Sequence, residues 1–191
     1  MATAVFGEDI RILAFAGSTR ADSYNQQLVE EAAGVAEEMG AKVTLVRLRD
    51  YPMPLYDADL EQKEGMPKNA KRLRQLMIES DAVIIASPEY NHSISGVLKN
   101  TLDWISRGED GNGSYEASKG KVFALMSASP GKKGGRRALA HLDDIIRDLK
   151  GTIVEERVSI AHAYKYFGEK ERAENPSVKK AVQQVLATCK K

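Results

Sequence analysis

Short apolar stretches that alternate with helical patterns are the feature of this sequence that most limits its fold. The apolar stretches predict strands at residues 10–17, 42–48, 82–87, 121–129 and 152–160. Amphipathic stretches predict helices from about Ser23–Asn25 to Gly40 and at 95–107, 136–151 and 176–191. Because parallel strands need crossover helices, and those crossovers are right-handed, the alternation predicts a five-stranded doubly wound α/β sheet.

The composition fits one domain and excludes several kinds of partner. The chain has 191 residues, of which 42% are hydrophobic, so we expect a single domain over residues 1–191 with its own core. A formal net charge of +1 gives no reason to expect nucleic acid or an anionic membrane as a partner. No apolar stretch approaches the roughly 20 residues that span a bilayer, and the first residues lack the pattern of a signal peptide. A single cysteine, Cys189, allows no internal disulfide, so we expect a cytoplasmic location.

Two polar segments interrupt the alternation of strands and helices. Residues 49–67 are rich in prolines and acidic side chains and are expected to form a surface excursion. Residues 108–120 are rich in glycine and polar side chains, so we expect a loop at the edge of the functional site or at a subunit contact. Neither segment has the character of a linker, and both are assigned to the single domain.

The loop after the first strand, residues 17–25, is dense in hydrogen-bond donors. Ligands of an open parallel sheet bind beyond the carboxyl ends of the strands, where this loop and those at 87–95 and 127–135 are expected. Hydroxyls, an amide and an arginine beside the positive end of a helix are typical of phosphate binding. The residues concerned are Ser18, Thr19, Arg20, Ser23 and Asn25. A helix cap with a solvated arginine is the alternative, but a cap explains only Ser23 or Asn25 and not five donors in eight residues.

The same loop lacks two common nucleotide-binding motifs. It is not a GxxxxGK[ST] loop, and no GxGxxG pattern follows the first strand. A serine-rich loop with one arginine instead suits a terminal monophosphate, such as that of flavin mononucleotide (FMN).

The loop after the third strand suits a flat heteroaromatic ring. Pro88 and Tyr90 can form an apolar wall, while the backbone amides of Glu89, Tyr90 and Asn91 can point at ring nitrogen and oxygen atoms. The Glu89 side chain is either catalytic or a structural carboxylate that receives loop amides. His92 is a candidate general base, but a local hydrogen bond is the favoured interpretation.

The loop after the fourth strand is small and rich in glycine. Gly131, Gly134 and Gly135 allow the backbone to approach a ligand closely. Lys132 and Lys133 either attract a second substrate that carries phosphate or are simply solvated.

With their positions in the chain, these three loops resemble the NADPH-dependent FMN reductase family, over roughly residues 9–160. The resemblance implies a flavodoxin-like fold with strand order 2-1-3-4-5. It implies that the FMN phosphate is held by Ser18, Arg20, Ser23, Asn25 and the backbone amide of Thr19. It implies that the isoalloxazine ring is embraced by Pro88, Glu89, Tyr90 and Asn91, with Ser127 and Gly131 near its other edge.

The resemblance also implies a function. NADPH or NADH would reduce bound FMN, and a quinone would take the electrons, with chromate or azo compounds as further acceptors. No catalytic side chain and no metal is assigned, because the cofactor carries the chemistry. The alternatives are an electron-transfer flavodoxin, a reductase that releases reduced FMN to an oxygenase, and a flavin-free interaction protein. By analogy we expect a homodimer or homotetramer, with contacts at residues 95–107 and 49–66.

Overall fold

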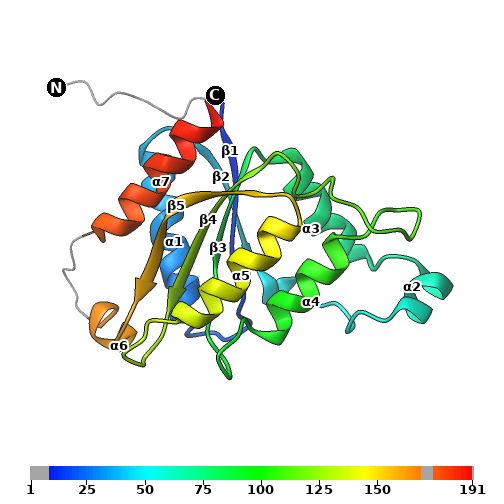
Figure 1. Cartoon of the computed structure of the whole chain (residues 1–191), viewed down its shortest axis with the longest axis horizontal. Coiled ribbons are helices and arrows are strands. Elements are labelled where there is room, and N and C mark those ends of the chain that lie inside the picture. The colour runs from blue at the N-terminus through cyan, green and yellow to red at the C-terminus, as the bar shows by residue number, and fades with distance from the viewer. Residues whose placement is uncertain (1–8, 169–173, 191) are drawn as a thin grey trace.

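A computed structural model describes residues 9–168 and 174–190 of the protein, which contain one parallel sheet with strand order β2-β1-β3-β4-β5 (Figure 1). The strands are β1 (Arg11–Ala16), β2 (Lys42–Arg47), β3 (Ala82–Ala86), β4 (Val122–Ala128) and β5 (Thr152–Ile160). The five predicted strands and the flavodoxin-like order are therefore confirmed.

Helices cover both faces of the sheet (Figure 1). One face is covered by α1 (Tyr24–Glu38) and α7 (Pro176–Cys189). The other face is covered by α3 (Lys68–Glu79), α4 (Gly96–Ile105) and α5 (Arg136–Asp148). The remaining helices are the short α2 (Ala58–Glu64), α6 (Ala163–Tyr166) and the 3-10 turn η1 (Leu48–Asp50).

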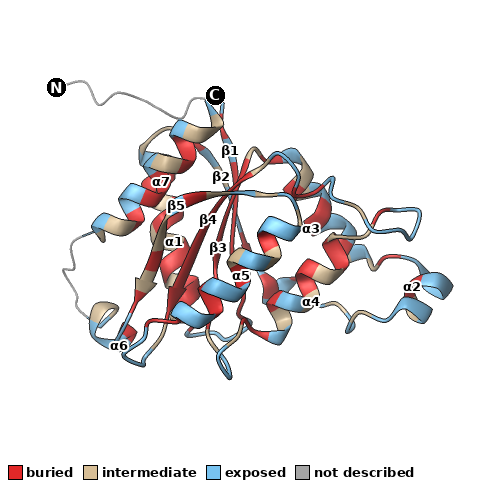
Figure 2. Ribbon diagram, in the orientation of Figure 1, coloured by how far each residue is buried: buried red, intermediate tan, exposed pale blue. Residues whose placement is uncertain are grey.

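Alternate side chains of each central strand belong to two separate cores. In β1, Ile12 and Ala14 pack with α1 and α7, whereas Leu13 and Phe15 pack with the helices of the other face. Every residue of β3 is buried, and Figure 2 shows the middle of the sheet as continuously buried. Burial on both faces explains why the central strands are apolar runs rather than alternating patterns.

The segment at residues 49–67 is more than the predicted surface excursion. It contains α2 and the end of η1, and it is attached to α4 through Trp104, whose Nε1 donates to the Pro54 carbonyl at 2.8 Å. The ring of Tyr56 meets the Trp104 ring edge-on, with 5.0 Å between centroids. The segment therefore covers part of the surface of α4 that was expected to contact another subunit.

The loop at residues 108–120 lies at the amino edge of the sheet, away from the predicted site. It follows α4, which begins after the carboxyl end of β3 and returns the chain to the start of β4. The prediction that this loop borders the functional site is therefore wrong, and its role as a subunit contact stays a prediction.

Membrane and metal features were searched only in the described ranges. No helix there is both long enough and apolar enough to cross a bilayer. Those residues also contain no group of three or more His, Cys, Asp or Glu that could hold a metal ion. The first eight residues, where no signal peptide was predicted, and Lys191, the expected end of the last helix, lie outside the described residues.

Candidate functional site

Three polar loops lie side by side at the carboxyl edge, because β1, β3 and β4 are neighbours in the sheet. The first residue of a loop can continue the hydrogen-bonding ladder of its strand. Gly17 N donates to the Ala86 carbonyl at 2.8 Å, and Ser87 N donates to the Met126 carbonyl at 2.8 Å. The sheet thus fixes the starting points of these loops relative to one another.

The first loop ends at the N-terminus of α1. Ser23 is the N-cap, and its side-chain oxygen accepts a hydrogen bond from Gln26 N at 3.3 Å. The first bond of the helical ladder runs from Gln27 N to the Ser23 carbonyl, so the amides of Tyr24 and Asn25 come before it. Such amides carry the positive end of the helix dipole and are available to an anion.

Side chains of the same loop add a hydroxyl and a full positive charge. Ser18 is buried, and its Oγ accepts from Arg20 N at 3.3 Å, while Thr19 and Arg20 are exposed. Within the described part of the chain, the Arg20 guanidinium forms no ion pair. The loop therefore combines helix amides, hydroxyls and an uncommitted arginine, which is the donor set that a phosphate dianion needs.

Asn25 makes contacts within the protein that the sequence did not indicate. Its buried side chain donates to the Ala128 carbonyl at 2.9 Å and accepts from Ala128 N at 2.8 Å. These two bonds tie the start of α1 to the end of β4. The Asn25 side chain therefore positions the loop, and its backbone amide is the group directed by the helix toward an anion.

The second loop makes a tight hairpin at residues 90–93. Tyr90 and Ser93 exchange two backbone hydrogen bonds of 3.0 Å, and Asn91 and His92 have φ angles of 48° and 69°. Positive φ at both central positions matches a type I′ turn. The expectation that the Tyr90 amide points at a ring is therefore wrong, because that amide already donates to Ser93. The Tyr90 side chain is 51% exposed and remains a possible wall.

The carboxylate of Glu89 caps α5. Its Oε2 accepts from the backbone amides of Arg137 at 3.1 Å and Ala138 at 3.4 Å, which favours the structural role over the catalytic one. The Nδ1 of His92 contacts the Arg137 guanidinium and lies 3.7 Å from Glu89 Oε1. These are the local contacts expected of a loop histidine.

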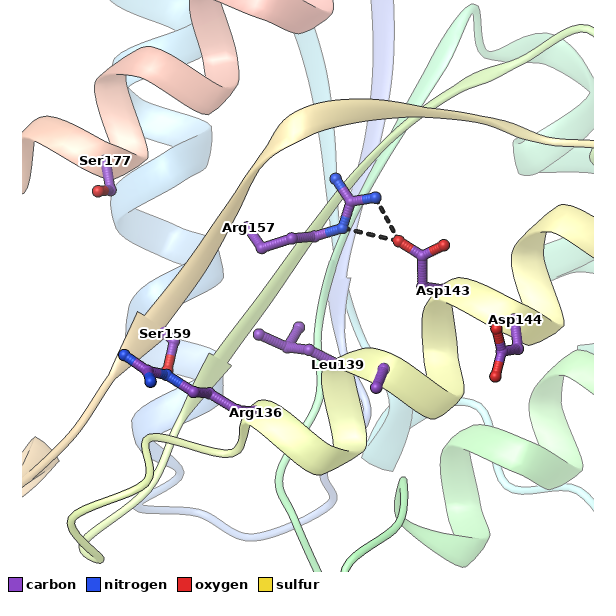
Figure 3. A pocket seen from close by; sticks show the side chains of 8 residues that line it. Arg136, Leu139, Asp143, Asp144, Arg157, Ser159 and Ser177 are labelled. Atoms are coloured by element: carbon purple, nitrogen blue, oxygen red, sulfur yellow. Dashed lines mark hydrogen bonds and ion pairs between the residues drawn. The ribbon is translucent and has the colours of Figure 1, made fainter.

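The third loop is held from below by Ser127. The Ser127 hydroxyl is fully buried and donates to the Ser87 carbonyl at 2.7 Å. A Cβ on Gly135, whose φ is 78°, would lie 1.8 Å from Ser127 Oγ. A Cβ on Gly134 would lie 2.4 Å from the Oγ of Ser159, which lies near the end of β5 (Figure 3). These two glycines therefore allow close packing within the chain, contrary to the expectation that they face a ligand. Gly131 is exposed and is the glycine of this loop that a ligand can reach.

Two supporting residues were not assigned from the sequence. The hydroxyl of Ser95, which caps α4, donates to the Gly17 carbonyl at 2.5 Å. A Cβ on Gly17 would lie 2.8 Å from Leu98 Cβ, so the first loop passes directly against α4. The GS pair and a capping serine were visible in the sequence, but their contact spans 78 positions and depends on the fold.

Comparison with known proteins identifies the family. A model of the NADPH-dependent FMN reductases matches residues 10–165. The chain belongs to this family. An NAD(P)H-dependent FMN reductase of Pseudomonas aeruginosa is 33% identical over 180 residues, which cover 94% of this chain and 92% of that protein. A quinone reductase of Escherichia coli is 32% identical over 149 residues, covering 78% of this chain and 76% of that one.

Solved structures agree on the fold of this FMN reductase family member. The flavoenzyme FerB, an NAD(P)H:(acceptor) oxidoreductase of Paracoccus denitrificans, superposes with a TM-score of 0.72 at 24% identity, over 95% of this chain and 97% of that one. RosB with a bound riboflavin-5′-phosphate derivative superposes with a TM-score of 0.77 at 16% identity, over 95% and 79% of the two chains. At these identities the likeness concerns the flavodoxin-like fold.

The FMN reductase site fits its cofactor at the phosphate end. The first loop offers the amides that precede the α1 ladder, the Ser18 and Ser23 hydroxyls, and the Arg20 charge. The charge of Arg20 is not neutralised by an acidic side chain of the described residues, so a dianionic ester can pair with it. At the ring end, the exposed Tyr90 side chain and the amides of Glu89 and Asn91 lie on the neighbouring loop.

Proposed function

We propose that the protein oxidises NAD(P)H at a bound FMN and passes the electrons to a quinone. The observation that carries the proposal is the first loop, where helix amides, buried hydroxyls and Arg20, which has no ion pair among the described residues, converge at the start of α1. The family match supports FMN as the ligand proposed for this loop, and the name of the Escherichia coli relative suggests the acceptor.

The chain's own residues bind the cofactor and orient it. Arg20, Ser18, Ser23 and the first amides of α1 hold the phosphate, and the Asn25–Ala128 pair keeps this anchor fixed relative to the loop after β4. When bound, FMN supplies the redox chemistry, which is to take a hydride equivalent from NAD(P)H and deliver two electrons to an acceptor.

The second and third loops set the ring position without acid or base catalysis. Glu89 locks the hairpin at residues 90–93 onto α5, and Ser127 locks the third loop onto Ser87. Pro88, which was predicted to form part of the apolar wall, is buried. Because the Glu89 and Ser127 side chains bond to backbone groups, we assign no catalytic side chain.

Reconstitution with FMN tests the proposal. The purified protein should bind FMN with the phosphate-dependent preference expected of the first loop, so riboflavin should bind at least tenfold more weakly. The loaded protein should then consume NADPH or NADH continuously when a soluble quinone is added. An FMN-loaded protein that oxidises neither coenzyme would contradict the proposed oxidoreductase activity and would support the alternative of an electron-transfer flavodoxin.

We also propose self-association and a cytoplasmic location. Leu55, in the segment before α2, is 79% exposed, and burial of such a side chain at a subunit contact would be favourable. The proposed state is a homodimer or homotetramer. Replacement of Leu55 with Asp, followed by light scattering, tests whether this segment takes part in the subunit contact.

The lone Cys189 supports a location in a reducing compartment. Chromate and azo compounds remain proposed further acceptors.

A further inference from the structure

Two turns at the carboxyl edge are joined into one surface beyond the three loops of the FMN site. They are the turn after β4, residues 129–134, and the turn after β5, residues 161–165, which leads into the short helix α6. Ser129 N donates to the Ile160 carbonyl at 3.0 Å, Ala163 N donates to the Ser129 carbonyl at 3.0 Å, and His162 N donates to the Gly131 carbonyl at 3.2 Å. These backbone bonds hold the second turn beside Gly131, the residue expected near one edge of the flavin.

This joined surface carries three exposed lysines, Lys132, Lys133 and Lys165. None of them forms an ion pair within residues 9–168 and 174–190. Lysines on two hydrogen-bonded turns give this surface a positive potential, which favours a bound anion.

The same surface carries an aromatic face. The rings of His162 and Tyr164 are 6.2 Å apart at an interplanar angle of 86°, so Tyr164 is braced edge-on by its neighbour. Tyr164 is nevertheless 49% exposed. Exposed aromatic rings beside cations are typical of sites that stack a base and bind its phosphates.

We propose that this surface binds the adenosine 2′-phosphate half of NADPH and makes NADPH the preferred coenzyme. The inference rests on the proposed function, in which the nicotinamide lies at the flavin. The adenosine half of the dinucleotide then extends away from the flavin and needs a separate binding surface. The adenine ring stacks on Tyr164. The 2′-phosphate, which NADH lacks, pairs with Lys132 and Lys133, and Lys165 adds to the local positive potential.

Direct binding tests the surface without turnover. With FMN-loaded protein, calorimetry should show that 2′,5′-ADP binds at least tenfold more tightly than 5′-AMP, and that this difference shrinks as salt is raised. In the double variant Lys132→Ala, Lys133→Ala, the two nucleotides should bind alike. Equal binding of the two nucleotides to the unmodified protein would overturn the proposal.

Steady-state kinetics distinguish recognition of the 2′-phosphate from recognition of the adenine base. The double lysine variant should raise KM for NADPH about tenfold and leave KM for NADH within twofold, because NADH has no 2′-phosphate. Tyr164→Ala should raise KM for both coenzymes alike, because both carry adenine. Equal losses with both coenzymes in the lysine variant would overturn the phosphate assignment.

Matched controls lie at the amino edge, where Tyr115 is 51% exposed and Lys119 is also exposed. Tyr115→Ala and Lys119→Ala should leave the KM values for NADPH and NADH unchanged. KM increases in these control variants as large as those in the lysine and Tyr164 variants would overturn the proposed nucleotide site. If the loaded protein oxidises neither coenzyme, the proposed function fails, whereas the binding of 2′,5′-ADP still decides whether this surface recognises the nucleotide.

Discussion

Two arginines at the amino edge of the sheet, Arg74 and Arg107, are held differently from Arg20 at the carboxyl edge. At the amino edge, Arg74 Nε donates to the Arg107 carbonyl at 2.8 Å, and its guanidinium pairs with Glu116. Arg107 in turn pairs with Glu61 at 3.0 Å, and this hydrogen bond raises the pKa of Arg107. At the carboxyl edge, Arg20 forms no ion pair within the described residues.

This difference separates structural charge from binding charge. A buried charge that is paired with protein groups stabilises a loop, and removal of one partner leaves the other without compensation. An exposed charge without a partner contributes little to folding, and its expected contribution is to a ligand. Asn25 does not fit this division, because it belongs to the loop of Arg20 but both polar atoms of its side chain bond to Ala128.

Asn25→Ala should have the largest effect on stability. It leaves the buried amide and carbonyl of Ala128 without partners, so we expect the free energy of unfolding to fall by about 3 kcal/mol. Urea denaturation of the FMN-free protein measures this. Ser23→Ala removes only the cap of α1 and should cost about 1 kcal/mol. A smaller loss for Asn25→Ala than for Ser23→Ala would mean that Asn25 is not the clamp described here.

Arg74→Met tests the structural side of the comparison. The Arg74 side chain is 9% exposed, so loss of its charged hydrogen bonds should lower the free energy of unfolding by about 2 kcal/mol. FMN affinity should stay within twofold, because the change lies at the other edge of the sheet. Lys71→Met, an exposed change on the same helix, is the control and should change neither quantity. Weakened FMN binding in Arg74→Met would show that the two edges are coupled.

Arg20→Ala tests the binding side. We expect the Kd of FMN to rise at least tenfold, which corresponds to about 1.4 kcal/mol or more for a lost charged hydrogen bond, while riboflavin affinity stays unchanged. The free energy of unfolding without FMN should change by less than about 0.5 kcal/mol. Fluorescence titration with both flavins measures the difference. Unchanged FMN affinity would remove the phosphate assignment from this loop.

The strands and the position of the site could be predicted because both follow from short-range pattern. Runs such as residues 82–86 are apolar throughout since β3 is covered on both faces, and the rule for open sheets then places ligands at the carboxyl edge. The helix α3 was not assigned, because its apolar residues are sparse among lysines and arginines. Only its inner residues, Ala70, Leu73 and Met77 among them, are buried.

The roles of individual polar side chains could not be predicted in the same way. Asn25, Glu89 and Ser127 satisfy backbone groups that are 103, 48 and 40 positions away in the chain. Residue type shows that such a side chain can donate or accept, but only the fold shows whether its partner is the protein or a ligand. The position of residues 108–120, in contrast, could have been predicted. A helix after β3 must return to the amino edge, so the topology alone excludes that loop from the site.

The smallest effect is expected for His92→Asn. His92 occupies a left-handed turn position at φ 69°, and asparagine adopts that conformation readily, so the hairpin at residues 90–93 should persist. The ring of His92 contacts Arg137 and lies near Glu89, and both contacts are within the protein. Quinone turnover under saturating NADPH should therefore stay within twofold. A loss of tenfold or more, with FMN still bound, would make His92 a proton donor and would move part of the chemistry from the cofactor to this loop.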